Sequence, residues 1–333
     1  MELYLIIMLA LMILGSIYSL HAKDLLSAVV SYGIVGFALV ISFLLLQAPD
    51  LAIVQVVVEI ITLIIMIAVI TNTTHETESK KLGLGAIFYS VSVLLFVTVA
   101  LLFMSRFAFV LNSFGQHVTR MADNYVGSVA ETGSANIITG IIFHFRAYDT
   151  LGEATVLFTA VIGVICILRH EELKAPDAVK IDVIQTMPKG MTLVVKNICQ
   201  FLAPVIFLFG AYVAIHGHLS PGGGFTGGVI MASAFIFQIL AGGSVLDKLR
   251  KEKWRLELSE SVAIFSFLLL AVLGLLIASA LVFFANFLPT GNIGELVSGG
   301  IIPIGNVIIG IEVCAAISSI FVALLIYKDE ELG

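Results

Sequence analysis

Charged residues are scarce in this sequence, and their scarcity excludes most classes of soluble protein. The 333 residues include 17 Lys and Arg and 23 Asp and Glu, which is 12% of the chain, whereas a soluble domain carries about 25%. Hydrophobic residues make up 59% and fall in long blocks. A water-soluble core of this size would lack the polar surface to cover it. The composition excludes a soluble enzyme, a nucleic-acid binder and a disordered tail, and it predicts an integral membrane protein.

Cysteine is also rare, which bears on cofactors. Cys166, Cys199 and Cys314 each lie inside an apolar run, and no CxxC pair occurs. We therefore expect no iron–sulfur or zinc site in this chain. The seven histidines lie near the ends of the apolar runs or between them, which argues against a haem held inside a helix bundle. We expect no metal and no cofactor bound by this chain.

Nine apolar runs are long enough to cross a membrane, since a span needs ~20 apolar residues to cross ~30 Å of hydrocarbon. The first run has no Lys or Arg before it, unlike a secretory signal, so we interpret it as a true span. Continuous runs favour helices over the alternating segments of a barrel. We predict an all-α, polytopic membrane protein. The expected helices are 3–20, 25–46, 51–71, 82–104, 150–168, 192–216, 223–246, 260–286 and 301–327.

The basic residues predict the orientation. With nine spans, 14 of the 17 Lys and Arg lie on one side of the membrane, and only Arg106, Arg120 and Arg146 lie on the other. Cytoplasmic connections carry the excess of basic residues. The N-terminus is therefore expected outside and the C-terminus in the cytoplasm.

Polar stretches divide the chain into blocks. Residues 1–72 hold three expected helices, and residues 82–170 hold two with a long outside connection. A charged cytoplasmic linker, 171–191, leads to four expected helices in 192–328. Within the long connection, the apolar stretch 136–145 is too short to cross the membrane, so we expect a helix at the interface or packed on the bundle.

The third run carries an acid near the membrane midplane. Glu59 shares a helix face with Gln55 and Thr62, which makes a polar stripe on an aliphatic helix. A buried carboxyl group is costly, and it can gain and lose a proton in a transport cycle. A structural hydrogen bond to a neighbouring helix is the alternative. Asp50, just after Pro49, could cap this helix or handle ions.

Two further groups of acids lie in the later runs. Asp149 and Glu153 share a helix face if a helix begins near Ala147, and Arg146 is placed to neutralise one of them. Two close carboxylates can share a proton or coordinate Na⁺, but a helix N-terminus also favours acids through its dipole. Glu312 lies near the centre of the last run, where ion handling and a helix–helix hydrogen bond are both open interpretations.

A glycine-rich segment joins the sixth and seventh runs on the outside. It reads His216-Gly-His-Leu-Ser-Pro-Gly-Gly-Gly-Phe-Thr-Gly-Gly228, which is incompatible with ordinary helix. The glycines allow a tight turn and a close approach of two helices. A proton relay at an entrance suits the histidines better than a metal site, because no third ligand is nearby. The candidate residues of this loop are His216, His218, Pro221, Gly222, Gly223 and Gly224.

Three motifs resemble the Mrp-type antiporter family. Ala48-Pro49-Asp50-Leu51-Ala52, with Gln55 and Glu59, resembles a segment in the C-terminal part of the large Mrp A subunit. Phe145-Arg146-Ala147-Tyr148-Asp149-Thr150-Leu151-Gly152-Glu153 resembles the next piece of that subunit, and the glycine-rich segment resembles the signature of the Mrp B subunit. The three motifs have the order of these pieces in Mrp operons, and together they cover nearly the whole chain.

The resemblance implies a role in ion transport. Mrp complexes are multi-subunit Na⁺(Li⁺)/H⁺ antiporters, and the same module occurs in membrane-bound hydrogenases and sulfur-reducing relatives of respiratory complex I. The family's acids that match Glu59, Asp149 and Glu153 are implicated in the ion path. One departure is that this chain starts directly with the small segment, whereas in the Mrp antiporter a large, many-span domain precedes it. We therefore expect no transport by this chain alone.

The resemblance also implies partners and a location. We expect a membrane subunit in a Na⁺ or H⁺ pathway, with Na⁺ as a candidate transported ion, in a hydrogenase- or sulfur-reductase-type complex or a split Mrp antiporter. Its partners would be B-, C-, D-, E-, F- and G-like Mrp subunits, membrane lipid and, in a redox complex, nickel and iron–sulfur proteins. The expected location is the cytoplasmic membrane of a bacterium or archaeon. A structural scaffold is the alternative, and a self-sufficient organic-solute transporter is a third class.

Overall fold

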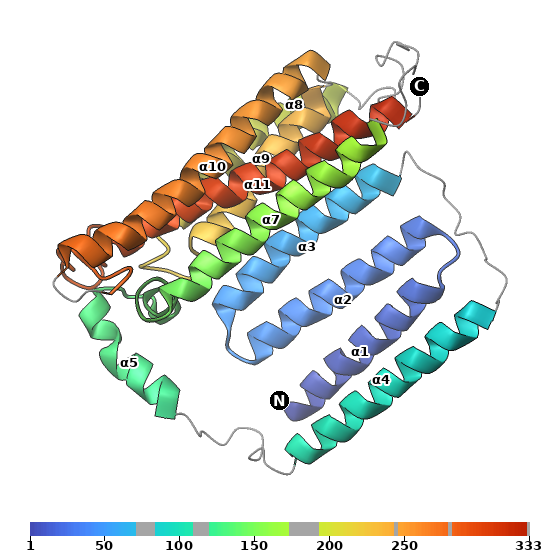
Figure 1. Cartoon of the computed structure of the whole chain (residues 1–333), viewed down its shortest axis with the longest axis horizontal. Helices are drawn as coiled ribbons and strands as arrows, with labels where there is room; N and C mark the ends of the chain where they lie inside the picture. The colour runs from blue at the N-terminus through green and yellow to red at the C-terminus, as the bar shows by residue number, and fades with distance from the viewer. Residues whose placement is uncertain (71–83, 109–119, 173–192, 243–245, 279–281, 332–333) are drawn as a thin grey trace.

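Helices make up most of the part of the chain that the structure describes (Figure 1). A computed structural model describes residues 1–70, 84–108, 120–172, 193–242, 246–278 and 282–331, and no strand occurs in these ranges. The prediction of an all-α polytopic membrane protein is confirmed. The expected linker 171–191 lies almost wholly outside the described residues.

The first three helices run up, down and up as neighbours. They are α1 (Glu2–His21), α2 (Leu25–Leu45) and α3 (Pro49–Ile70), and α2 packs between the other two. The turn before α2 is short because Asp24 caps the helix: its carboxylate accepts a hydrogen bond from the backbone N–H of Ser27 at 3.1 Å.

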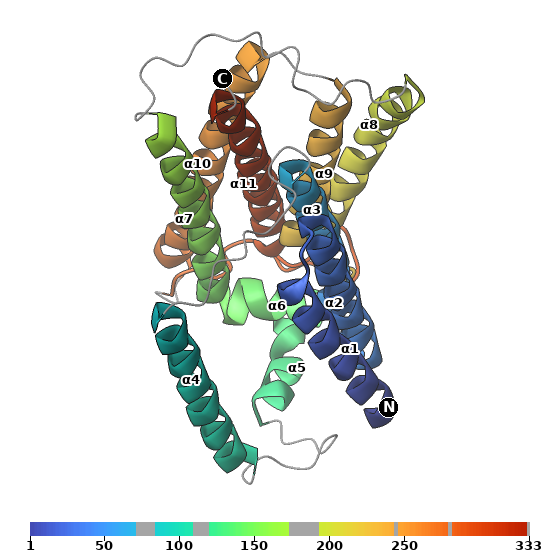
Figure 2. The ribbon, with the colours of Figure 1, turned by 90° about the vertical axis from the view of Figure 1, so that its right-hand side faces the viewer.

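The middle of the chain contains two long helices and a bent connection. These elements are α4 (Leu84–Ala108), α5 (Arg120–Thr132), α6 (Ile137–Gly140) with the π-helical turn η1 (Ile141–Phe145), and α7 (Ala147–Glu172). The axes of α5 and of the α6–η1 segment differ by 87°. The short helix expected in the long connection is therefore present, and it packs against α5 and α7. α4 lies apart from the bundle in Figure 2.

The last four helices form the densest part of the molecule. α8 (Leu193–Ile215) packs on α9 (Gly224–Gly242), while α9 and α10 (Leu246–Ile277) both pack on α11 (Ile302–Glu331). α7 also packs on α11, and α3 packs on α9, so these two helices help to join the two earlier blocks to this group. α11 is thus the central helix, next to α7, α9 and α10 (Figure 1).

The described helices account for most of the expected spans. Seven are long and apolar enough to cross a membrane, or eight if the bent pair of α5 and α6–η1 counts as one span. α4 and α9 fall short in their described apolar parts, Val91–Arg106 and Gly224–Ile239. The count of nine and the orientation stay predictions. The beginning of α1 and the end of α11 lie at opposite ends of the molecule in Figure 2, as an odd number of crossings requires.

One expected boundary was wrong. The eighth helix was expected over 260–286, but α10 begins at Leu246 and ends at Ile277. Its first turns carry five basic residues between Lys248 and Arg255, together with Trp254. A charged helical end projecting beyond the hydrocarbon is favourable, since its backbone bonds are satisfied and its charges reach water.

Candidate ion pathway

Glu59 lies at the contact between α3 and α2. Its side chain is 2% exposed, and one oxygen, Oε2, accepts a hydrogen bond from Nε2 of Gln55 at 3.3 Å. Its other oxygen, Oε1, has no hydrogen-bond partner within the described residues. The carboxyl group rests against Gly36 of α2, where any side chain would overlap it. Glu59 is therefore a buried and incompletely satisfied acid, and Gln55 shares its face of α3 as expected.

The second group of acids begins at the start of α7, where the sequence placed it. α7 starts at Ala147, and Thr150 fastens it to η1 by donating a hydrogen bond to the carbonyl oxygen of Ile142 at 2.6 Å. Arg146 and Asp149 form an ion pair at 2.6 Å, with side chains 52% and 50% exposed. The expected neutralisation of an acid by Arg146 thus occurs at Asp149, in a half-exposed position where screening leaves such a pair weak.

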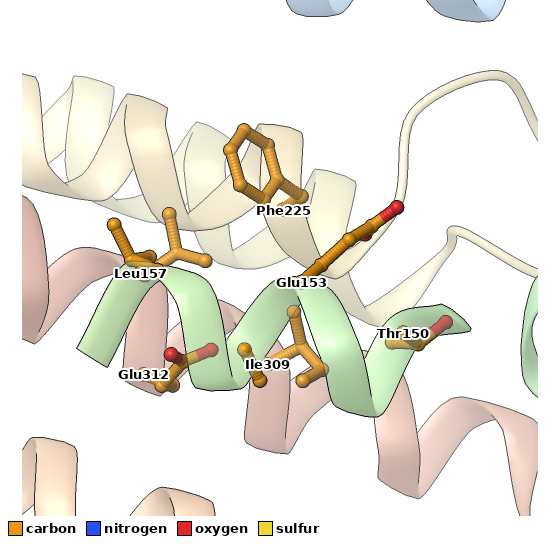
Figure 3. A pocket seen from close by; sticks show the side chains of 8 residues that line it. Thr150, Glu153, Leu157, Phe225, Ile309 and Glu312 are labelled. Carbon is orange, nitrogen blue, oxygen red and sulfur yellow. The ribbon is translucent and has the colours of Figure 1, made fainter. Parts of the chain in front are cut away.

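Glu153, one turn further along α7, lies beside a small pocket that also reaches Glu312 of α11 (Figure 3). Glu312 is 1% exposed, and neither of its carboxyl oxygens has a hydrogen-bond partner within the described residues. The two carboxyl groups point in different directions in Figure 3. A proton passing between them therefore needs a side-chain rotation or a bridging water. The complete lining is Thr150, Glu153, Ala154, Leu157, Phe225, Ile309, Glu312 and Val313.

A further buried acid, Glu260 of α10, was missed by the reasoning from sequence. It is 2% exposed and close enough to Glu312 for the two carboxylates to repel each other. The sequence placed it at the first residue of an expected span, where an acid is unremarkable. The sequence gives no clear local signal for its burial, because charged residues precede it and only the residues after it form an apolar run.

Asp50 lies in a polar network at the end of the bundle where α3 begins. One oxygen, Oδ1, accepts hydrogen bonds from Nδ2 of Asn136 and from the backbone N–H of Gly222, both at 3.1 Å. The same amide of Asn136 donates to the carbonyl oxygen of Ser220 at 3.0 Å. Asp50 therefore joins α3, α6 and the glycine-rich loop, which come from three separate parts of the sequence.

The glycine-rich loop needs its glycines for conformation and for space. Gly222 and Gly223 have φ angles of +131° and +127°, which side chains rarely adopt. A side chain on Gly224 would overlap the backbone of Asn306 in α11, whose Oδ1 accepts a hydrogen bond from the Gly224 N–H at 2.8 Å. Pro221 is exposed in the turn before them. The loop thus ends against α11.

The two candidate histidines of the loop differ in their surroundings. His218 is fully buried, and burial lowers the pKa of its ring. Its backbone oxygen accepts hydrogen bonds from the N–H groups of Ala135 and Asn136 at 2.9 and 3.0 Å. His216 is partly exposed and stacks on Tyr212, with ring centroids 4.0 Å apart. His216 is thus the better placed of the two to meet water, while His218 is enclosed in the contact with α6.

The structure therefore brings the predicted residues together in three places. Glu59 and Gln55 lie at the α2–α3 contact, Glu153 and Glu312 line one pocket, and Asp50 bonds to the loop at Gly222. Carboxylates such as these can hold a proton or offer oxygen ligands to Na⁺.

Three family models match successive parts of the chain. Residues 10–75 match the MbhD family and residues 89–185 match the MbhE family, both described as MBH subunits. Residues 194–319 match the MnhB family, described as "Domain related to MnhB subunit of Na+/H+ antiporter".

Two curated proteins are similar in sequence to parts of this chain. An uncharacterized protein of Methanocaldococcus jannaschii is 31% identical over 199 residues, which are 55% of this chain and 74% of that protein. A putative antiporter subunit, mnhA2, of Staphylococcus aureus is 32% identical over 159 residues, 46% of this chain. The match spans only 19% of the staphylococcal protein.

Two solved structures share the fold. A chain of the Mrp complex from Dietzia sp. DQ12-45-1b superimposes with a TM-score of 0.72 at 22% identity, over 96% of this chain and 34% of the other. A chain of the membrane-bound sulfane sulfur reductase, an archaeal respiratory membrane complex, superimposes with a TM-score of 0.56 at 31% identity. That match covers 72% of this chain and 98% of the other.

Proposed function

Because the chain belongs to the Mrp-type antiporter family, as a fusion of MbhD-, MbhE- and MnhB-like parts, we propose that it provides part of a Na⁺ or H⁺ pathway in a multi-subunit membrane complex. The observation that carries the proposal is the burial of Glu59 and Glu312 with carboxyl oxygens that no described group satisfies. An acid at the centre of a span costs roughly 2.5–3.5 kcal/mol on insertion scales. A purely structural acid would recover that cost through hydrogen bonds.

The pathway that we propose uses the acids in two places. Glu59 and Gln55 form one polar position at the α2–α3 contact, and Glu153 and Glu312 form another between α7 and α11. Asp149 is paired with Arg146 at the exposed start of α7. In this proposal it is the first carboxyl group that a cation from solvent meets on its way to the pocket. Each carboxyl group binds a cation in its charged form and releases it on protonation, which is the elementary exchange step of an antiporter.

The complex that we propose is redox-driven, of the membrane-bound hydrogenase or sulfur-reductase type. The matches to the MbhD and MbhE families and the coverage of 98% of a chain from the archaeal sulfur reductase support this choice over a free antiporter. The partners would be Mrp-like membrane subunits with iron–sulfur or nickel proteins, in the cytoplasmic membrane of a bacterium or archaeon. Na⁺ is the proposed transported ion beside H⁺.

A scaffold role is the second candidate, and the network around Asp50 favours it. Hydrogen bonds from Asn136 and Gly222 to one carboxylate connect three parts of the chain that match three different families. Such connections hold helices in fixed positions whether or not ions pass among them.

Substitution of the candidate acids, the buried Glu59 and the exposed Glu153 beside the pocket, distinguishes these functions. Glu59→Gln and Glu153→Gln, each made in the full complex, should leave assembly intact and reduce Na⁺-dependent proton exchange in inverted vesicles by at least about tenfold, since positioned acid–base groups contribute about 10²- to 10⁴-fold. Glu131→Gln, on the exposed side of α5, is the control and should exchange normally. Normal exchange in both test variants would refute the pathway assignment and leave the scaffold role.

A further inference from the structure

Glu260 lies one turn beyond Glu257, the last residue of the charged first part of its own helix. It follows Leu246, the first residue of α10, by about four helical turns, or roughly 20 Å. Its side chain is 2% exposed, and oxygen Oε1 has no hydrogen-bond partner within the described residues. Buried Ala263 and Phe267 follow it on the same helix. An unpaired carboxylate would be expensive at this depth, so a proton is needed on or near Glu260.

Glu312 faces it from the neighbouring helix. α10 packs on α11, and the two carboxyl groups are close enough to interact electrostatically. Both oxygens of Glu312 lack hydrogen-bond partners within the described residues, and its side chain lines the pocket beside Glu153. Two adjacent carboxyl groups that cannot both ionise hold one proton between them.

Among the described residues, ionisable groups approach this pair from α10 and from α7. On α10, the nearest acid towards the helix start is Glu257, which pairs with Lys253 at 3.7 Å and is 40% exposed. On α7, the next ionisable group is Glu153. On α11, the buried hydroxyls of Ser318 and Ser319 follow Glu312. Carboxyl groups thus continue from the wetter end of α10 through the bundle to the pocket.

We propose that Glu260 and Glu312 form a proton-sharing pair that carries protons between the charged end of α10 and the pocket at Glu153. This inference rests on the proposed function and specifies the ion on this branch as H⁺. In each step an O–H bond of one carboxylic acid breaks, a bridging water or a rotated side chain passes the proton on, and an O–H bond forms at an oxygen of the other carboxylate. The negative charge moves in the opposite direction, and no oxidant or reductant takes part. Rotation of Glu312 or a bridging water completes the step to Glu153, whose carboxyl points elsewhere in Figure 3.

The test compares Glu260→Gln, Glu312→Gln and the double variant in the full complex. Each single variant should reduce Na⁺-dependent proton exchange in vesicles at least about tenfold. The double variant should lose little more, because residues that act as a unit are non-additive. Glu252→Gln is the matched control: it lies two turns before Glu260 on α10 and pairs with Arg255 at 3.4 Å. The control should exchange normally.

A second readout follows the shared proton itself. Infrared difference spectra of the intact complex between acid and alkaline pH should contain the C=O stretch of a buried protonated carboxyl, and Glu260→Gln should remove it. If a Gln variant fails to assemble, Glu260→Asp keeps a carboxyl group and should restore both the band and part of the exchange. An unchanged band together with full exchange in both single variants would overturn the pair.

The two proposals fail in different ways. Loss of exchange in Glu59→Gln, Glu153→Gln and Glu312→Gln, with full exchange in Glu260→Gln, would remove the proton branch and retain the pathway. Full exchange in all four variants would remove both.

Discussion

Gly36 of α2 controls the position of the Glu59 carboxyl group, and Gly36→Ala therefore tests whether that position matters. A methyl group at residue 36 would overlap the Glu59 carboxyl in its present rotamer. The carboxyl must then move away from α2, which breaks the 3.3 Å hydrogen bond from Gln55. No backbone change is needed, because Gly36 is an ordinary helical residue without a positive φ.

The magnitude follows from three contributions. Overpacking a well-packed contact costs about 1–3 kcal/mol, and loss of the Gln55 hydrogen bond costs about 1 kcal/mol. Alanine in place of a helical glycine stabilises the helix by about 0.5–1 kcal/mol. The net destabilisation should be about 1–3 kcal/mol, measured as a lower thermal transition of the purified complex. Ion exchange in vesicles should fall as far as in Glu59→Gln.

Gly33→Ala is the matched control. Gly33 lies one turn earlier on α2, in the same contact with α3, and its added methyl would meet only the end of the flexible Leu63 side chain. That side chain can rotate, so stability and exchange should change little. The reasoning is refuted if Gly36→Ala retains full exchange in a complex in which Glu59→Gln abolishes it, since the location of the carboxyl would then be irrelevant.

The remaining predictions concern the end of the bundle at the glycine-rich loop. Asp50→Ala removes the acceptor for Asn136 and Gly222, so it should lower the stability of the complex by about 1–3 kcal/mol in thermal unfolding, whereas Asp50→Asn, which keeps an acceptor oxygen, should cost less. Burial lowers the pKa of His218 below its ordinary value of 6.5, so the unfolded chain binds more protons just below that pH and stability should fall on acidification from about pH 8 to about pH 5.5. His218→Gln should make that fall shallower; an equally steep fall in the variant would contradict it.

Helices and motifs could be predicted because their signals are local. Long apolar runs specify membrane helices through the cost of unsatisfied backbone groups in lipid. α7 begins at Ala147, which is the condition under which Asp149 and Glu153 share a helix face, and the Gln55–Glu59 contact followed from their i,i+4 spacing on one helix. Each of these depends on residues a few positions apart.

Contacts between distant segments could not be predicted. Nothing in the sequence shows that Asp50 meets Gly222, or that Gly36 makes room for Glu59. The burial of Glu260 could not be predicted for a related reason. A helix that starts in a charged cluster has no local feature at the point where it enters hydrocarbon, so the depth of Glu260 depends on how α10 packs against α11.

The fusion of the three parts has a physical consequence for ion coupling. α3 packs on α9, α7 packs on α11, and Asp50 bonds to both Asn136 and Gly222. A shift of α3 that repositions Glu59 must therefore move the glycine-rich loop, whose end is fastened to α11 through Asn306. α11 carries Glu312. Because close-packed helices move between discrete arrangements more readily than they deform, a change at Glu59 can reach Glu312 through these contacts. Asp50→Ala should then weaken the coupling of Na⁺ to H⁺ movement as well as stability. If the Asp50 hydrogen bonds had a structural role only, stability would fall and the coupling would not change.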